Sequence, residues 1–321
     1  MTVTSTDVAR AAGVSRTTVS YILNGKGEQF TEKTRKLVKK TAKDLGYRPV
    51  AAAQTLARGS SNVILTLIPL SPNVEFMAMM SQLAQRLSKE SQTLLMMPPA
   101  VSAKDLEYTV QTVRPRLFLA ETHLTPAQRK VLKKAKTPFV DVAAETSRKG
   151  GMNWRIGQLQ AEHLSACGIT QLVYARLSTA ENDVIQKARQ AGFFAKCDEL
   201  GLPKPVTVTV NPQSDLNIDI MRSLKKHAGI ACYNDDTAAA MLGAGHLIGL
   251  SAPDDFAIIG VDNTTIALQT DPQLSTIATK GEILPLIDTL LSIPENSGDY
   301  TTCKNPNLTV ITRGTTKSGL A

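Results

Sequence analysis

The 321-residue chain has few aromatic residues, few cysteines and no long apolar run. Aromatic residues make up 4% of it, with a single tryptophan, while 20% of the residues are charged, an ordinary share for a globular protein. The longest apolar runs, such as Val63–Leu70, have the length of a strand and are much shorter than a membrane span. The four cysteines are widely spaced without a CxxC pair, so neither a zinc site nor a disulfide framework is indicated.

A secretory leader is also missing from the first thirty residues. Asp7, Arg10 and Arg16 interrupt the one candidate stretch, so no basic segment is followed by an apolar one. We therefore expect a cytoplasmic protein without contact to a membrane. No motif calls for a metal or a cofactor, and we expect none.

Positive charge is concentrated at one end of the chain. Residues 1–60 hold 11 Lys or Arg against 4 Asp or Glu, whereas the remaining 261 residues hold 25 against 24. A small basic unit of this kind is typical of domains that contact nucleic-acid phosphates. A solvated lysine face on an ordinary helix would give a similar balance.

The basic segment also shows the signals of three short helices. Thr4 and Asp7 form a capping box that opens the first helix. A turn with a glycine separates it from a second helix over Arg16–Asn24, and a third is expected over residues 31–45. Two short helices joined by such a turn predict a helix-turn-helix, whose second helix presents its first residues to base edges in the major groove.

The runs TSTDVARAAGVSRTTVSYILNGKG and TRKLVKKTAKDLGYRPVAAAQTLARGSSNVI resemble the headpiece and hinge of the lactose-repressor/galactose-repressor family. The resemblance implies an all-α headpiece over residues 1–49 and a hinge helix over 50–61. In the family this helix folds on operator DNA and inserts a leucine into the minor groove, which implies that role for Leu56, next to Ala53. A helix this short is marginal alone in water, and an inserted apolar side chain kinks the duplex. Leu56 could instead simply pack within a linker helix.

On the second helix, Arg16, Thr17 and Tyr21 are the candidates for reading bases. Arg16 can form two hydrogen bonds to a guanine, although many such residues hold a phosphate instead. Candidates for contacts with the DNA backbone, several of which also cap helices, are Thr4, Ser15, Ser20, Asn24, Thr31 and Thr34. One headpiece reads only a few base pairs, so we expect a homodimer on a palindromic double-stranded operator.

From residue 63 onward, short apolar strands alternate with amphipathic helices. This alternation predicts α/β architecture with parallel sheets covered on both faces. We expect two lobes that meet near Gly150–Met152, with a ligand beyond the carboxyl ends of the strands. The predicted strands are Val63–Leu70, Thr93–Met97, Arg116–Ala120, Phe139–Val142, Leu172–Leu177, Val206–Val210, Gly229–Tyr233 and Ala257–Val261.

The segments ACYNDDTAAAML and SAPDDFAIIGVDNTTIALQTDPQLSTI resemble the body of the same family, which is similar to periplasmic sugar-binding proteins. The resemblance implies an effector-binding and dimerisation body over residues 62–321. Its first lobe would hold residues 62–150 and about 275–300, and its second 151–274 and 301–321. The positions that match the family's effector contacts are Phe76, Arg189, Asn234 and Asp262. An arginine, an amide, a carboxylate and an aromatic face suit a polyhydroxylated ligand.

Each of these residues also has a structural interpretation. Arg189 could pair with a carboxylate, and Asn234 could cap the helix that follows it. The segment Met152-Asn153-Trp154-Arg155 departs from the family, which often has an aspartate there. Trp154 could stack on a sugar or could pack in a core or interface. Arg155 would favour an anionic effector such as a sugar phosphate.

Other functional classes receive less support from the sequence. The glycines around Gly243 lack the spacing of a dinucleotide loop, and no nucleophile elbow or HExxH motif is present. The basic headpiece and the missing leader argue against a transport receptor. We therefore expect a DNA-binding transcriptional regulator, a repressor rather than an enzyme, switched by a carbohydrate-like metabolite. The alternatives are an α/β sugar receptor that does not bind DNA and a small-molecule enzyme.

Overall fold

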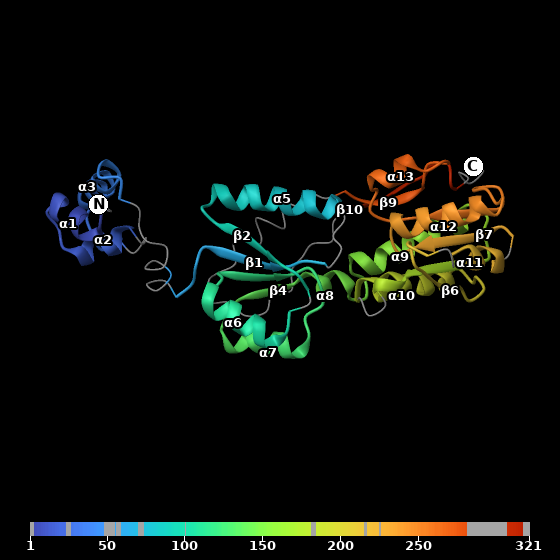
Figure 1. Ribbon diagram of the computed structural model, residues 1–321, viewed down its shortest axis with the longest axis horizontal. Helices are drawn as coiled ribbons and strands as arrows, with labels where there is room; N and C mark the ends of the chain where they lie inside the picture. The colour runs from blue at the N-terminus through green and yellow to red at the C-terminus, as the bar shows by residue number, and fades with distance from the viewer. Residues whose placement is uncertain are drawn as a thin grey trace.

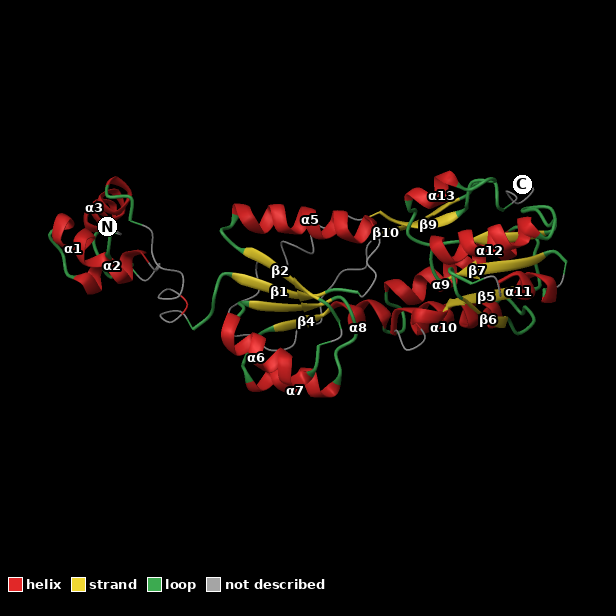
Figure 2. Cartoon of the chain, viewed as in Figure 1, coloured by secondary structure: helices red, strands yellow, loops and turns green. Residues whose placement is uncertain are grey.

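The computed structural model describes residues 3–23, 27–47, 55, 59–69, 74–99, 101–180, 184–214, 217–224, 226–280 and 307–316. Figure 1 shows a three-helix headpiece followed along the long axis by two α/β lobes. Figure 2 shows that both lobes hold a sheet with helices on its two faces. The all-α headpiece and the two parallel-sheet lobes confirm the predicted fold class.

The headpiece consists of α1 (Ser5–Ala12), α2 (Arg16–Leu23) and α3 (Glu32–Asp44). One fully buried valine from each helix, Val8, Val19 and Val38, meets the others in a small core. Gly13 ends α1 with φ 65°, a left-handed conformation that glycine adopts at little cost. These helices agree with the predicted helix-turn-helix and third helix.

The first lobe contains a parallel sheet in which the described strands have the order β2-β1-β3-β4. The helix α5 packs on one face against Ile64 and Leu117, while α6 and α7 pack on the other face against Leu65 and Phe118. Neighbouring residues of the two central strands, β1 and β3, thus point to opposite faces and are buried on both. The elements are β1 (Val63–Leu67), α5 (Val74–Lys89), β2 (Thr93–Met97), α6 (Ala103–Val113), β3 (Leu117–Ala120), α7 (Pro126–Lys134), β4 (Phe139–Asp141) and α8 (Val142–Ser147).

The second lobe repeats this plan with the described strand order β6-β5-β7-β8. Tyr174 and Ile259 pack with α9 and α10 on one face, and Val173 and Ile258 pack with α11 and α12 on the other. The elements are α9 (Met152–Ala166), β5 (Leu172–Leu177), the 3-10 turn η1 (Ser178–Ala180), α10 (Val184–Glu199), β6 (Val206–Val210), α11 (Asn217–Ser223), β7 (Ala228–Cys232), α12 (Asp235–Leu247), β8 (Phe256–Ile259) and α13 (Thr265–Gln269).

A final antiparallel pair, β9 (Thr276–Lys280) and β10 (Asn307–Ile311), packs on the second lobe. Ile277 is fully buried with Tyr174 and Ile259, and the Gly260 amide donates to the Ser275 carbonyl at 2.9 Å. The expectation that the first lobe resumes at about residue 275 is therefore wrong for residues 275–280. They remain with the second lobe because Ile277 completes its core.

Candidate functional site

The helix α2 presents one exposed polar face opposite its buried face. Val19 and Ile22 are buried against α1 and α3, while the side chains on the other side are exposed. That exposed face holds Arg16, Thr17, Ser20 and Tyr21. The Tyr21 ring lies 6.5 Å from the Phe30 ring, which supports it from the side. The three predicted base readers therefore lie together on the surface of one helix.

Three of the predicted DNA-backbone residues cap helices. The Asp7 and Thr18 amides donate to the hydroxyls of Thr4 and Ser15 at 3.4 and 3.0 Å, and Thr31 caps α3 in the same way. Hydrogen bonds from Thr4 to the Asp7 carboxylate hold the pKa of that carboxyl below its ordinary value. Thr34 lies in the first turn of α3, where its hydroxyl is 2.8 Å from that of Thr31. Asn24, Ala53 and Leu56 lie outside the described residues.

A second polar group lies at the carboxyl edge of the second-lobe sheet and centres on Arg189. This arginine lies on α10 and is only 7% exposed. Its Nε donates to Asn153 Oδ1 at 3.0 Å, and its Nη1 donates to the Tyr233 carbonyl at 2.6 Å. Its Nη2 lies 3.6 Å from Asp262 Oδ1, and its guanidinium lies 5.0 Å from the centre of the Tyr233 ring. The structure thus brings Arg189 and Asp262 together as a charged pair.

The backbone at Asp262 is in an unusual conformation. Asp262 has φ 99° and Asn263 has φ 53°, both in the left-handed region where side chains other than glycine are uncommon. The surrounding structure fixes this turn: the Asp262 amide donates to the Ile277 carbonyl at 2.9 Å, and Arg313 donates to Asn263 Oδ1 at 2.6 Å. Strained residues held in this way occur often at ligand sites. The side chain of Asp262 remains 25% exposed.

Asp235 is fully buried next to this turn. Its carboxylate accepts hydrogen bonds from the Thr276 hydroxyl at 2.7 Å and from the Thr264 amide at 2.7 Å. Burial raises the pKa of Asp235 to about 6, against the effect of these hydrogen bonds, and the nearby Asp262 carboxylate raises it further. Asp235 thus ties α12 to α13 and β9.

The other predicted effector residues differ in their surroundings. The Asn234 Oδ1 accepts the Thr237 amide at 2.9 Å, so Asn234 caps α12 at the edge of the Arg189 group. Trp154 is half-buried on α9, with the Lys149 ammonium 5.9 Å from its ring. Arg155 is exposed and paired with Glu162 at 2.8 Å, so its guanidinium does not join that of Arg189. Phe76 packs on the core of the first lobe.

Asn153 is a contact that sequence reasoning missed. It is 1% exposed, and its Nδ2 donates to the Thr146 hydroxyl at 3.2 Å while its Oδ1 accepts from Arg189. A hydrogen-bonded chain therefore runs from α10 through α9 to α8, the helix that connects the two lobes in the sequence. The departure from the family at residues 152–155 was the only available signal.

Two glycines allow α9 and α10 to approach closely. A Cβ on Gly157 would lie 1.8 Å from the Arg189 carbonyl oxygen, and one on Gly192 would lie 2.0 Å from the Trp154 carbonyl oxygen. No side chain fits at such distances. The two glycines thus place the Arg189 helix directly against the Asn153 helix.

Carboxylates gather at the carboxyl edge of the first-lobe sheet. Glu121 follows β3, and Asp141 ends β4, where it accepts the Ala144 amide at 2.8 Å and pairs with Arg129. Burial raises the pKa of Glu121 to about 7, and the Asp141 carboxylate contributes to this shift. Neither carboxylate is predicted from the sequence.

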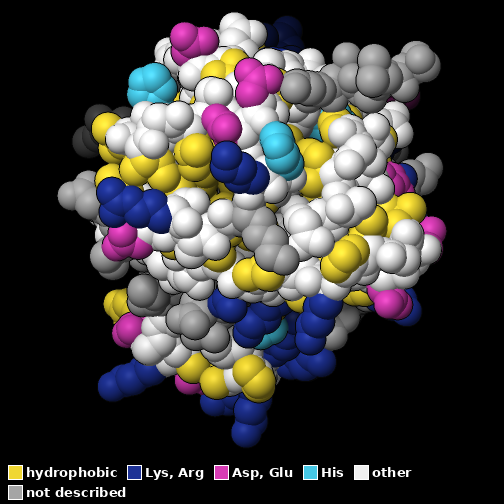
Figure 3. Space-filling model, turned by 90° about the vertical axis from the view of Figure 1, so that its right-hand side faces the viewer, with side chains coloured by type: hydrophobic (Ala, Val, Ile, Leu, Met, Phe, Trp, Pro, Cys, Tyr) yellow, Lys and Arg dark blue, Asp and Glu magenta, His cyan; other side chains and the backbone are white. Residues whose placement is uncertain are grey.

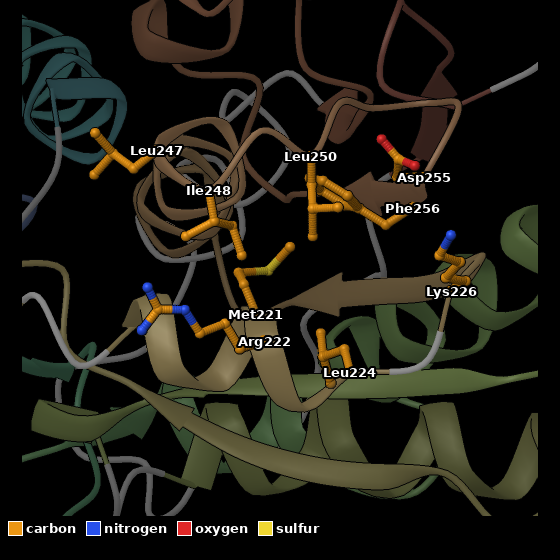
Figure 4. Close-up of a pocket in the computed structure, with 9 residues that line it drawn as sticks. All are labelled: Met221, Arg222, Leu224, Lys226, Leu247, Ile248, Leu250, Asp255 and Phe256. Carbon is orange, nitrogen blue, oxygen red and sulfur yellow. The ribbon is translucent and has the colours of Figure 1, made fainter.

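One cavity of about 610 Å³ lies at the opposite edge of the second-lobe sheet (Figure 4). Met221 and Leu224 from the α11 side meet Ile248, Leu250 and Phe256 there, with charged side chains around them. None of the predicted effector residues lines it. In the described part of the chain, no group of residues suits a metal ion, and no helix is long and apolar enough to cross a bilayer.

Comparison with family models gives two matches. Residues 4–50 match bacterial regulatory proteins of the lacI family, and residues 161–284 match a periplasmic binding protein-like domain. The first match covers the headpiece helices, and the second covers most of the second lobe.

Curated relatives match over most of the chain. The chain is 27% identical over 296 residues to the HTH-type transcriptional regulator GntR of Pseudomonas aeruginosa, covering 88% of this chain and 85% of the relative. It is 28% identical over 287 residues to the HTH-type transcriptional repressor PurR of Vibrio parahaemolyticus, covering 84% and 85%.

Solved structures share the fold over nearly the whole length. A lac repressor dimer bound to operator and the anti-inducer ONPF has a TM-score of 0.72 at 20% identity and covers 98% of this chain and 99% of its own. A complex of the transcriptional regulator CelR with cellobiose has a TM-score of 0.62 at 16% identity, with the same coverage.

Proposed function

We propose that this chain, which belongs to the lacI family of bacterial regulatory proteins, is a cytoplasmic repressor switched by a small polyhydroxylated metabolite. It is a DNA-binding transcriptional regulator with a periplasmic-binding-protein-like effector domain. Regulators of this family are not enzymes. The repressor role is supported by relatives whose names describe repressors, such as PurR.

The exposed face of α2 supports reading of DNA bases by Arg16, Thr17 and Tyr21. These side chains lie together on a short helix whose opposite face is buried, the arrangement that lets a recognition helix enter the major groove. The cap residues Thr4, Ser15 and Thr31, together with Ser20, Asn24 and Thr34, would contact phosphates. In the hinge, Leu56 and Ala53 would reach the minor groove, with Leu56 inserted between base steps.

The pairing of Arg189 with Asp262 is the observation that most supports an effector site. A buried guanidinium held by three contacts and a carboxylate that is 25% exposed offer neighbouring donors and an acceptor, which suit paired hydroxyls. Asn234 lies beside them, Trp154 comes next to Asn153 on α9, and Phe76 would close the site from the first lobe. Because Arg155 is paired with Glu162, we favour a neutral sugar-like ligand over a sugar phosphate. A structural neighbour whose name includes cellobiose is consistent with this class.

A ligand changes DNA affinity only if it binds one arrangement of the two lobes better than another. The hydrogen bonds from Arg189 through Asn153 to Thr146 connect the proposed site to the crossover helix α8. A ligand that alters the Arg189–Asp262 pair would therefore bias the angle between the lobes. That angle would set the distance between the two hinges of a dimer.

The test begins with a thermal-shift screen of sugars, sugar phosphates and nucleosides, since a ligand that binds the native state raises its stability. Affinity for a selected DNA duplex is then measured with and without the compound found. Asp262→Asn should lose the response, while its DNA affinity without ligand stays within about tenfold, or about 1.4 kcal/mol, of the parent. Asp219→Asn, an exposed carboxylate on α11, is the matched control and should respond normally. A full response from Asp262→Asn would contradict the site.

A further inference from the structure

Basic residues gather at the amino edge of the first-lobe sheet, where the chain arrives from the headpiece. Hydrogen bonds define this edge: the Ser61 amide donates to the Arg114 carbonyl at 2.7 Å, and the Thr93 amide donates to the Asn62 carbonyl at 2.9 Å. The Phe118 amide donates to the Pro138 carbonyl at 2.9 Å. The beginnings of all four described strands and the end of the linker therefore lie together. Figure 1 shows β1 entering the lobe from the side of the headpiece.

Cationic side chains stand just before the start of β2, β3 and β4. We call this group the amino-edge surface, and its members are Lys89, Arg114, Arg116, Lys133, Lys134 and Lys136. Figure 3, a view from the opposite end of the molecule, also shows Lys and Arg side chains gathered at its lower part. The opposite edge of the same sheet carries the carboxylates Glu121 and Asp141. Charge is thus separated across the lobe.

Helix dipoles account for only part of this charge. The helices α5, α6 and α7 end at this edge, and each helix end is equivalent to about half a negative charge. Glu90 and Glu107 add two negative charges and pair with Arg86 and Lys134 at 2.7 and 2.8 Å. Among the described residues, the six cations and Arg86 exceed these charges by about 3.5. A positively charged edge of this kind suits an anionic partner.

The position of the surface favours DNA as the anionic partner. Residues 48–60 separate the headpiece from Ser61, and a chain of that length spans at most about 50 Å. One helical turn of duplex DNA is about 34–36 Å long. DNA held by the headpiece therefore continues past the first lobe within the span of the linker. An acidic protein would need no such proximity to the linker. In a symmetric dimer, each copy would present its own amino edge to one side of the operator.

We propose that the amino-edge surface attracts the phosphates of the DNA that flanks the operator, as a second electrostatic contact outside the headpiece. This inference rests on the proposed DNA-binding function. The attraction is sequence-independent and strongest at low salt, because salt screens charges over a Debye length of about 10 Å at 0.1 M. It would lengthen the protected DNA without adding to the sequence read by α2.

The test compares two variants with equal changes of charge. Lys89→Gln/Arg114→Gln/Lys136→Gln removes three exposed cations from the amino edge, and Lys187→Gln/Lys204→Gln/Lys226→Gln removes three exposed cations from the second lobe. Each is titrated on a short duplex selected from random DNA by the parent, and on the same site with about two helical turns added on each side. Salt is varied between about 50 and 200 mM.

On the long duplex, the amino-edge variant should show a slope of log K against log salt that is shallower by about 1–3, since each phosphate contact contributes about 0.9. On the short duplex its slope should match the parent, and the second-lobe variant should match the parent on both. An unchanged slope on the long duplex, or an equal loss on both duplexes, would overturn the flanking contact while leaving the proposed function intact. Failure of the parent to select any duplex would overturn the proposed function itself. Thermal melting should show both variants folded, because exposed substitutions of this kind usually change stability by no more than about 0.5 kcal/mol.

Discussion

Arg189 contacts three segments that are far apart in the sequence: Asn153, the Tyr233 carbonyl and Asp262. The family resemblance implies that Arg189 and Asp262 contact an effector, and the alternative for Arg189 is an ion pair with a carboxylate. The structure shows the ion pair, whose carboxylate is that of Asp262, and the effector role of both residues stays a prediction. Asn153 and Tyr233 could not be predicted, because their contacts depend on how closely α9 and α10 pack.

Glu121 shows the opposite case, a titratable side chain without any sequence signal. Its neighbours in the sequence are ordinary loop residues, and its properties come from burial after β3 and from Asp141 on β4. No pattern of residue types reports that combination, so only the folded lobe reveals it.

Glu121 predicts a pH dependence of stability. Its pKa is raised to about 7 in the folded state from 4.5, so protonation favours the fold, and this contribution is lost as the pH rises toward and through 7. One unit of pKa difference corresponds to about 1.4 kcal/mol. Glu121→Gln should therefore raise the free energy of unfolding at pH 8 by about 1–3 kcal/mol and change it little at pH 4.5.

Urea unfolding of Glu121→Gln and the parent at several pH values checks this expectation. Glu107, on α6 in the same lobe with its side chain 33% exposed, supplies the comparison: Glu107→Gln should leave the pH profile close to that of the parent. Equal slopes of stability against pH for Glu121→Gln and the parent would show that Glu121 is solvated.

At the scale of elements, periodicity and caps predicted the headpiece helices and the core strands of both lobes. The capping box of Thr4 and Asp7 marks the start of α1 clearly. The single fully buried valine of each headpiece helix marks the face that packs in the core. The helix α6 has a weak sequence signal, although Ser102 caps it through the Asp105 amide at 3.1 Å. Its buried side is narrow, with Leu106 and Val110 in one stripe, so the apolar signal is weak. The pair β9 and β10 was missed because its partner strands are about thirty residues apart.

The contact between α9 and α10 predicts the effect of one methyl group. In Gly192→Ala the new Cβ would meet the Trp154 carbonyl oxygen at 2.0 Å, so the two helices must separate. Forced overpacking of this kind costs about 1–3 kcal/mol. We expect that loss in the free energy of unfolding, together with a weaker ligand response, because the shift moves Arg189 from Asn153.

Gly243→Ala is the control, since nothing lies within 4 Å of a Cβ at that position on α12. It should be neutral or stabilising by up to about 1 kcal/mol, the helix propensity gained from alanine. Urea titration of Gly192→Ala and Gly243→Ala measures the free energy of unfolding of each variant. Stability of Gly192→Ala equal to that of Gly243→Ala would mean that the helices are not in close contact.

At the scale of the whole molecule, the sequence predicts two parallel-sheet lobes and a separate basic headpiece, because alternating strands and helices admit few topologies. The point at which the chain returns from the second lobe to the first is harder to predict from the sequence. Residues 275–280 stay with the second lobe because Ile277 fills a core whose other members lie far upstream. Long-range packing of that kind leaves no local pattern.

An exposed apolar surface on the first lobe supports the proposed dimer. Leu95 and Met96 on β2 are each 42% exposed, and Met77 on α5 is 37% exposed. The strand β2 is an edge of the described sheet, and exposed apolar edge strands tend to pair with another chain.

Leu95→Glu/Met96→Glu should convert the dimer to a monomer and weaken operator binding by more than tenfold, because one headpiece then reads only one half-site. Tyr108→Glu, at a 73% exposed position on α6, should leave both properties unchanged. Sedimentation equilibrium and DNA titration provide the measurements. A variant that remains dimeric would place the interface elsewhere.

Selection of binding sites from random DNA, performed in parallel with the parent and with Arg16→Ala, tests the central claim most directly. Sequence-specific reading by α2 in a symmetric dimer predicts that the parent enriches a site with two inverted half-sites. Arg16→Ala should lose preference at one position in each half-site, a cost of about 1–3 kcal/mol there, while the other positions are retained. A parent that enriches no sequence, or an Arg16→Ala variant whose selected site is identical to the parent's, would contradict the account.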